Sequence, residues 1–258
     1  MNPVRILLFV ASLLSSCASV ESRRGSESIE LDHIFIWVKQ DAPEADALRK
    51  LGLHGYEPVK HEGQGTSSLG FRFENAYLEL IWIDDYEVAK KAASAIQVDF
   101  AARSMGKKAR ASPFGIGLHM RGENTGPPFP TVTHRAAWMQ PGEAILVAQT
   151  ASNSAEPFVF VVPPTMANLT PEALAEMYQK RPGLKKIREH VLGVHLVTGA
   201  EFVVDQRTLD SSTLTLLVER GIASFTGGPD PLLRLTFDNG RQWKEADLRP
   251  TLPLVIAY

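Results

Sequence analysis

Cysteine is scarce in this chain, and so is any excess of positive charge. Cys17 is the only cysteine among 258 residues, and the formal net charge is −2 at pH 7. A single thiol cannot form an intramolecular disulfide or a cysteine metal cluster, so a metal site would need histidine and carboxylate ligands. A slightly acidic chain has no general attraction to nucleic acid, so we expect no nucleic-acid partner.

The hydrophobic run near the N-terminus is too short to cross a membrane. Residues 6–14 form a largely apolar run of nine residues, whereas about 20 are needed to span a bilayer. The run follows Arg5, an order typical of a secretory signal peptide. The sequence has neither a nucleophile elbow nor a dinucleotide-binding fingerprint, so it gives no support to serine-hydrolase or Rossmann-type chemistry.

A candidate lipidation motif follows this run. Residues 14–17 (LSSC) resemble a bacterial lipobox, which implies a lipoprotein signal peptide over residues 1–16 and membrane attachment through a lipid on Cys17. Residues 17–29 are mostly small, polar and charged, and predict a lipidated flexible tether. Ala18 in place of aspartate implies the periplasmic side of the outer membrane. An uncleaved signal peptide or an unmodified buried cysteine is the alternative.

The folded part begins with a pattern of one strand, one helix and further strands. Residues 31–38 are β-branched and aromatic and predict a buried strand, and a helix is expected between Asp41, a candidate N-cap, and Gly52. The first module, residues 31–84, is completed by strands near 55–62 and at 69–73 and 77–83. A longer helix, 86–105 within the segment 85–106, follows at helical apolar spacing.

Two further groups of strands follow this helix. The second module, residues 113–165, is expected to be mostly strands, at 114–120, 134–139, 144–149 and 157–162. Residues 166–258 predict a helical linker and a C-terminal βαβββ-like module. Repetition of one unit indicates duplication, since one half-sheet exposes an apolar face that another can cover. We therefore predict an α+β protein.

Several motifs together resemble the vicinal oxygen chelate superfamily, and within it the glyoxalase-like domains. The motifs are 31–34 (LDHI), 61–66 (HEGQGT), 74–82 (ENAYLELIW), 113–118 (PFGIGL) and the closing GRQ, DLRP and LPL within 240–254. The resemblance implies repeated βαβββ modules whose curved sheets form a half-open barrel around one cavity. It implies a glyoxalase-like domain over residues 30–165, and it leaves open whether the C-terminal unit pairs with the first module in one chain or across a homodimer.

The resemblance also implies a metal site. Metal-dependent members hold a divalent ion (Zn, Ni, Mn or Fe) with a histidine and a glutamate from each module, which here points to His33 and Glu79. In the second module His119 is the corresponding candidate, but no strand glutamate accompanies it. The alternatives are that His33 is a buried histidine bonded to backbone and that Glu79 pairs with Arg72 across the hairpin.

Three other residues are candidates for ligand binding: His61, Thr66 and Tyr77. The loop 61–66 contains two glycines and a hydroxyl, so its backbone N–H groups could face an anionic ligand, although a plain turn is the simpler interpretation. Without a metal, Glu79 remains a candidate catalytic base that takes a proton beside a carbonyl group.

These residues are compatible with three functions for an unidentified small-molecule partner. The first is a metal-dependent lyase, isomerase or dioxygenase, in which the ion stabilises an oxyanion. The second is a metal-free module that sequesters a small molecule, and the third is a non-catalytic scaffold in the envelope. Convergence of His33, Glu79 and His119 on one point would favour the first function.

Overall fold

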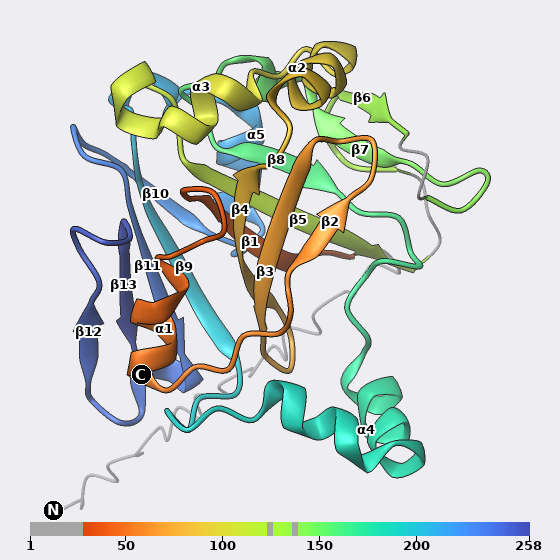
Figure 1. Ribbon diagram of the computed structural model, residues 1–258, viewed down its shortest axis with the longest axis vertical. Helices are drawn as coiled ribbons and strands as arrows, with labels where there is room; N and C mark the ends of the chain where they lie inside the picture. Colours follow the sequence, from red (N-terminus) through yellow and green to blue (C-terminus); the bar gives the residue numbers. More distant parts are fainter. Residues whose placement is uncertain (1–27, 123–125, 136–138) are drawn as a thin grey trace, which may run out of the picture.

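The computed structural model describes residues 28–122, 126–135 and 139–258. In this part of the chain two β-sheets form the body of the molecule, which Figure 1 shows with helices at its upper and lower ends. Sheet A has eight strands in the order β2-β3-β4-β1-β5-β8-β7-β6, and sheet B has five in the order β10-β9-β11-β13-β12. No helix in the described ranges is both long and apolar enough to span a membrane.

Sheet A consists of two halves with the same strand order, which meet along β1 and β5. Its strands are β1 (Ser28–Trp37), β2 (Val59–His61), β3 (Thr66–Arg72), β4 (Tyr77–Ile83), β5 (Phe114–Arg121), β6 (Thr131–His134), β7 (Ile145–Ala148) and β8 (Phe158–Val161). In each half the first strand pairs in parallel with the last, β1 with β4 and β5 with β8, while β1 and β5 are antiparallel. The predicted α+β class with repeated modules and a curved sheet is confirmed.

The two halves differ in their helices. The first half has α1 (Ala45–Leu51) between β1 and β2, whereas the described residues between β5 and β6 contain no helix. Helix α1 ends at Gly52 with φ 101°, as its sequence predicts. Asp41, however, is not the N-cap: it has φ 63°, and the helix begins after Glu44. Strand β1 begins at Ser28 and so includes the last residues of the predicted tether.

The long helix expected over 86–105 is two helices, α2 (Tyr86–Ala95) and α3 (Phe100–Met105). Gln97 between them has φ 56°, which ends the first helix, and the Asp99 side chain accepts a hydrogen bond from the Ala102 N–H and so starts the second. The break brings Ile96 and Phe100 into one buried cluster with Phe35 and Trp37 of sheet A. Helices α2 and α3 therefore cover one face of this sheet.

The other face of sheet A packs against sheet B. Side chains alternate along β1, so Ile34 and Ile36 join one buried cluster while Phe35 and Trp37 join another. The first cluster continues into sheet B through residues such as Phe202, which lies 5.5 Å from Phe114 between ring centroids. The cluster with Phe35 lies under α2 and α3 instead, and this is the face that carries the candidate site.

Sheet B and its helices form the C-terminal part. The strands are β9 (Val197–Val204), β10 (Ser224–Gly227), β11 (Leu232–Phe237), β12 (Glu245–Asp247) and β13 (Leu254–Ala257), and the helices are α4 (Pro171–Lys180) and α5 (Ser212–Glu219). Short 3₁₀ turns are η1 (Gly106–Ala109), η2 (Gln149–Ser152), η3 (Pro182–Arg188), η4 (Gln206–Thr208) and η5 (Asp238–Gly240).

The C-terminal element order is strand, helix and strands, as predicted, but the pairing is not that of a half of sheet A. Strand β9 lies between β10, which is parallel to it, and β11, which is antiparallel. Helix α5 thus returns the chain directly beside β9, a simple βαβ connection. In sheet A, by contrast, β3 and β4 separate the strand after the helix, β2, from β1. The predicted third βαβββ copy is therefore wrong in its topology.

Candidate functional site

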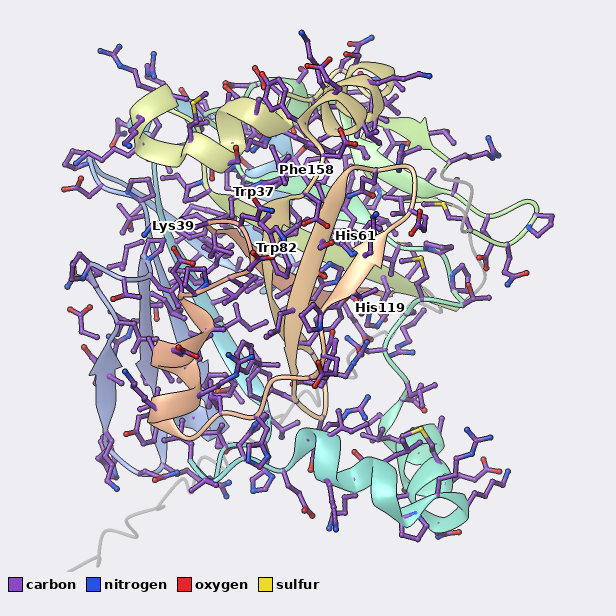
Figure 2. The ribbon with its side chains drawn as sticks, viewed as in Figure 1. Trp37, Lys39, His61, Trp82, His119 and Phe158 are labelled. Atoms are coloured by element: carbon purple, nitrogen blue, oxygen red, sulfur yellow. The ribbon has the colours of Figure 1, made fainter. Side chains whose placement is uncertain are left out.

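A cavity of about 400 Å³ lies on the face of sheet A that α2 and α3 cover. One part of its wall is apolar and consists of Phe35, Trp37, Ile81, Ile96, Phe100, Phe158, Phe160 and Val162. The other part is polar and consists of His33, Tyr56, His61, Ser68, Arg72, Tyr77 and Glu79. Figure 2 shows Trp37 and Phe158 below the two helices and His61 on the edge strand β2. Most of the polar residues come from the first half of sheet A.

Glu79 is the buried carboxylate of the polar part, with 8% of its surface exposed. Its Oε2 lies 3.7 Å from His33 Nε2, and its Oε1 lies 4.0 Å from His61 Nε2. Within the described residues it forms no ion pair with Arg72, whose guanidinium lies over aromatic rings instead. A carboxylate beside an apolar wall is costly to bury, so its place between two histidines calls for a chemical explanation.

His33 is held on all sides. Its Nδ1 lies 2.7 Å from Asp32 Oδ1, and its ring stacks on Tyr77 with centroids 4.3 Å apart. Below the ring is Gly117, where an added Cβ would come within 2.4 Å of it. These contacts leave Nε2 facing Glu79. The histidine is therefore bonded to a carboxylate rather than to backbone, and its second nitrogen is directed toward the cavity.

Asp32 holds His33 because β1 is irregular at this point. Leu31 pairs with Leu118 and His33 with Gly117, so Asp32 is an extra residue on β1. Such a bulge re-aims a side chain, and it brings the Asp32 carboxylate to the same site as His33. Burial raises the pKa of Asp32, but hydrogen bonds from His119 and His33 outweigh it and hold the pKa well below its ordinary value.

His119 is not part of the group around Glu79. Its Nδ1 lies 3.1 Å from Asp32 Oδ2, and its Nε2 lies 3.2 Å from Glu30 Oε2. His119 on β5 is paired with Glu30 on β1, beyond the bulge at Asp32. Its ring therefore contacts Asp32 Oδ2, whereas His33 contacts Oδ1. Figure 2 shows His119 well away from Trp37 and Phe158. The predicted ligand set of His33, Glu79 and His119 therefore does not form.

No other side chain among the described residues replaces His119 as a third metal ligand. On β5 and β8 the positions beside the site are Gly115, Gly117, Phe158 and Phe160, which carry no metal-binding atom in their side chains. His61 already bonds Thr66 Oγ1 through Nδ1 and Ser68 Oγ through Nε2. Among the described residues no three histidine, cysteine, aspartate or glutamate side chains are placed to hold a metal ion. The residues present do not fit the predicted divalent ion.

His61 lines the cavity, whereas Thr66 does not. Thr66 is fully buried and its hydroxyl lies 2.9 Å from His61 Nδ1, so it positions the histidine. Burial lowers the pKa of His61. The sequence left two alternatives for the loop between them, an anion-binding loop and a plain turn, and the structure shows a turn. Gln64 N–H donates to His61 O, and Gly65 has φ 72° and lies against Ala89.

Tyr77 and Tyr56 complete the polar part. Burial raises the pKa of Tyr77 well above its ordinary value and also raises that of Tyr56. No sequence motif points to Tyr56, but Gly70 is a signal: an added Cβ there would lie 2.1 Å from the Tyr56 hydroxyl, so the tyrosine crosses β3 at this glycine. Asp32 was also missed, since its role depends on the register of β1 and β5.

The N-terminal part of the described chain, from β1 to β5, matches a known family. Residues 31–124 match the family model described as a glyoxalase-like domain. The chain contains a glyoxalase-like domain. The matched segment of this domain carries Asp32, His33, His61 and Glu79, whereas Phe158 and Phe160 of the cavity wall lie beyond it.

Two solved structures are similar to the chain. A hypothetical protein from Staphylococcus aureus has a TM-score of 0.49 at 13% identity, over 89% of this chain and 98% of that one. Methylmalonyl-CoA epimerase from Mycobacterium tuberculosis has a TM-score of 0.31 at 15% identity, over 57% of this chain and 91% of that one. No curated protein matches the chain.

Proposed function

We propose that the glyoxalase-like domain is an enzyme that moves a proton on a carbon next to a carbonyl group of a small molecule. The observation that carries this proposal is the buried Glu79 carboxylate, 3.7 Å from a histidine that Asp32 holds in place. Buried acids and bases with a fixed partner, at the wall of a cavity, are typical of sites that transfer protons.

The two residues have complementary roles. Glu79 takes the proton from the carbon, and the electron pair of the broken C–H bond moves into the carbonyl to give an enolate. His33 acts as the imidazolium: its Nδ1–H donates to Asp32, whose carboxylate stabilises the cation, and its Nε2–H donates a hydrogen bond to the enolate oxygen. Return of the proton from Glu79 to a neighbouring carbon completes an isomerisation, and its return to the same carbon gives hydrogen exchange with solvent. This scheme uses His33 as the electrophile and so needs no divalent ion.

Hydrogen exchange in D₂O tests the scheme. The probes are 4-oxo-4-phenylbutanoate and its amide, which carry an apolar ring and an enolisable C–H beside a ketone. Loss of that proton signal in the NMR spectrum reports the reaction. We expect Glu79→Gln to slow the exchange by about 10²- to 10⁴-fold, whereas Glu62→Gln, an exposed neighbour on the turn, leaves it unchanged. Equal exchange in wild type and Glu79→Gln overturns the proposal.

Sequestration of a small molecule is the second candidate. It is favoured by the aromatic side of the cavity, where Phe35, Trp37, Phe158 and Phe160 form one cluster. A sequestering module binds the probes, raises its melting temperature and exchanges no protons. If the probes neither raise the melting temperature nor exchange protons, the scaffold role is favoured.

We also propose that the domain is tethered to the periplasmic side of the outer membrane by a lipid on Cys17. This residue and the predicted signal peptide lie outside the described residues, so the support is the LSSC motif behind an apolar run. Intact-mass measurement of the protein from membranes of a bacterial host tests this. We expect cleavage before Cys17 with an added diacylglycerol, and retention of the full leader in Cys17→Ser; an unmodified cysteine in the membrane fraction overturns it.

A further inference from the structure

Arg72 is a cation at the polar end of the cavity with no carboxylate partner among the described residues. It lies on β3 opposite Tyr77 of β4. Its guanidinium carbon is 4.7 Å from the centre of the Tyr77 ring and 5.3 Å from that of the Tyr56 ring. Cation–π contacts hold a guanidinium without occupying all its N–H donors. The side chain therefore retains donors for a further partner.

The position of Arg72 is fixed from the backbone outward. Its carbonyl oxygen lies 2.9 Å from His190 Nε2, and β3 pairs with β4 on its other side. Tyr56 reaches the guanidinium only because Gly70 lets it cross the strand. An arginine held in this way needs little ordering when it binds a planar anion with two parallel hydrogen bonds.

The surrounding charge also favours an anion. Lys60, an exposed residue of the cavity wall, forms no ion pair in the described residues. Arg188 donates to Phe73 O, and burial together with Arg72 lowers its pKa. Two acids of this region have other contacts: Glu79 faces the two histidines, and Glu74 lies 3.8 Å from His195. Neither of them pairs with Arg72.

The apolar side of the same cavity limits the rest of the ligand. Phe35 lies 5.9 Å from Phe158 and 6.0 Å from Phe160 between ring centroids, and Trp37 lies 6.0 Å from Phe35. Rings at such separations offer faces and edges for another ring to pack against. A cavity of about 400 Å³ has room for one ring and a short polar chain.

We propose that Arg72 binds a carboxylate of the ligand, so that the substrate class is an aromatic carboxylic acid with its ring against the phenylalanine cluster. The inference that this acid also contains a carbonyl group rests on the proposed function. The carboxylate contact does not, because it depends on Arg72 and on no proton transfer.

Calorimetry with two matched probes tests this on the full chain. 3-Phenylpropionate carries the carboxylate, and 3-phenylpropionamide replaces it with a neutral group of the same shape. Loss of one charge-assisted pair is expected to cost tenfold or more in affinity. We expect the wild type to bind the carboxylate at least tenfold more tightly than the amide, and Arg72→Met to remove that preference. Arg220→Met, an exposed arginine, is the control.

Arg72→Lys separates a fold defect from a binding defect, because it keeps the charge and loses the planar fork. We expect it to bind 3-phenylpropionate with intermediate affinity and to melt at the wild-type temperature. No binding of the carboxylate to wild type, equal binding of the two probes, or an unchanged preference in Arg72→Met overturns the inference. A selective loss in Arg72→Met without any proton exchange by wild type would retain this inference and reject the proposed function.

Discussion

Asp32 and His33 are consecutive residues of one strand, yet their side chains meet: Asp32 Oδ1 lies 2.7 Å from His33 Nδ1. In a regular strand neighbouring side chains point to opposite faces. The bulge at Asp32 removes that alternation and creates a carboxylate–histidine pair from adjacent residues. The same carboxylate accepts a hydrogen bond from the Asn168 N–H at 2.8 Å, so a later segment closes over the pair.

Asp32 should make the protein sensitive to acid. Its folded-state pKa lies below that of an unfolded aspartate, so the ionised carboxylate stabilises the fold above about pH 4 and this stabilisation is lost as the pH falls further. We expect Asp32→Asn to lower the free energy of unfolding at pH 7 by about 3 kcal/mol. Urea titrations between pH 7 and pH 3 measure it.

The quantity to follow is the difference in the free energy of unfolding between wild type and Asp32→Asn. Wild type and Asp32→Asn should converge in stability as the pH falls, because protonation abolishes the advantage of the wild-type carboxylate. The control is Asp205→Asn. Asp205 is partly exposed, and its Arg207 contacts lower its pKa to about 2, so the substitution should have a small effect on unfolding. A constant gap between wild type and Asp32→Asn down to pH 3 contradicts the assignment.

His119 should act through Asp32 and not through a bound ion. Glutamine at this position can still donate to Asp32, whereas phenylalanine cannot. We therefore expect His119→Gln to keep most of the wild-type stability and proton exchange, and His119→Phe to lose about 3 kcal/mol of stability because a buried carboxylate loses a partner. Denaturant unfolding and the exchange assay measure both. If the two variants lose activity equally while both remain stable, His119 has a direct role.

Gly117 gives a test of the position of His33. An added Cβ would lie 2.4 Å from the imidazole, so Gly117→Ala should displace the ring from Glu79 and slow proton exchange by at least tenfold. Overpacking of this kind costs about 1–3 kcal/mol. Gly183→Ala is the matched control, because nothing lies within 4 Å of its added Cβ. Melting curves and NMR exchange rates distinguish a local shift from unfolding.

The strands of the first half of sheet A were accessible to sequence reasoning because their side-chain alternation is strong. His33 and Glu79 were selected by resemblance, and the structure brings them together. The role of His119 could not be predicted in this way: alternation places it on the same face as Gly117, but the bulge at Asp32 determines what it meets. A shift of one residue in pairing leaves no periodic signal in the sequence.

The other features of the site and fold depend on contacts between residues far apart in the chain, which the sequence does not show. Tyr56 belongs to no regular element, and its place in the cavity depends on Gly70 in another strand. The C-terminal elements have the expected order, but local patterns do not show that β10 pairs with β9 rather than with β11, the strand that follows it. Local patterns define elements, whereas the neighbours of each element are set by contacts far apart in the chain.

Arg103 supports the cavity from behind and yields the last prediction. It is fully buried in α3, donates to Glu156 O at 2.6 Å and to Ala151 O at 2.8 Å, and lies over the Phe158 ring at 5.6 Å. Burial lowers its pKa to about 10, so it stays charged at pH 7. It thereby ties the covering helix to the segment before β8.

Arg103→Met should leave those carbonyl oxygens without donors and so destabilise the fold by about 3–5 kcal/mol. Because Phe158 is part of the cavity wall, binding of 3-phenylpropionate should weaken in the same variant at temperatures where it is still folded. Arg49→Met, an exposed arginine near Asp46, should change stability by less than about 0.5 kcal/mol. Urea unfolding and calorimetry measure these effects, and wild-type binding by a strongly destabilised Arg103→Met would show that α3 does not shape the cavity.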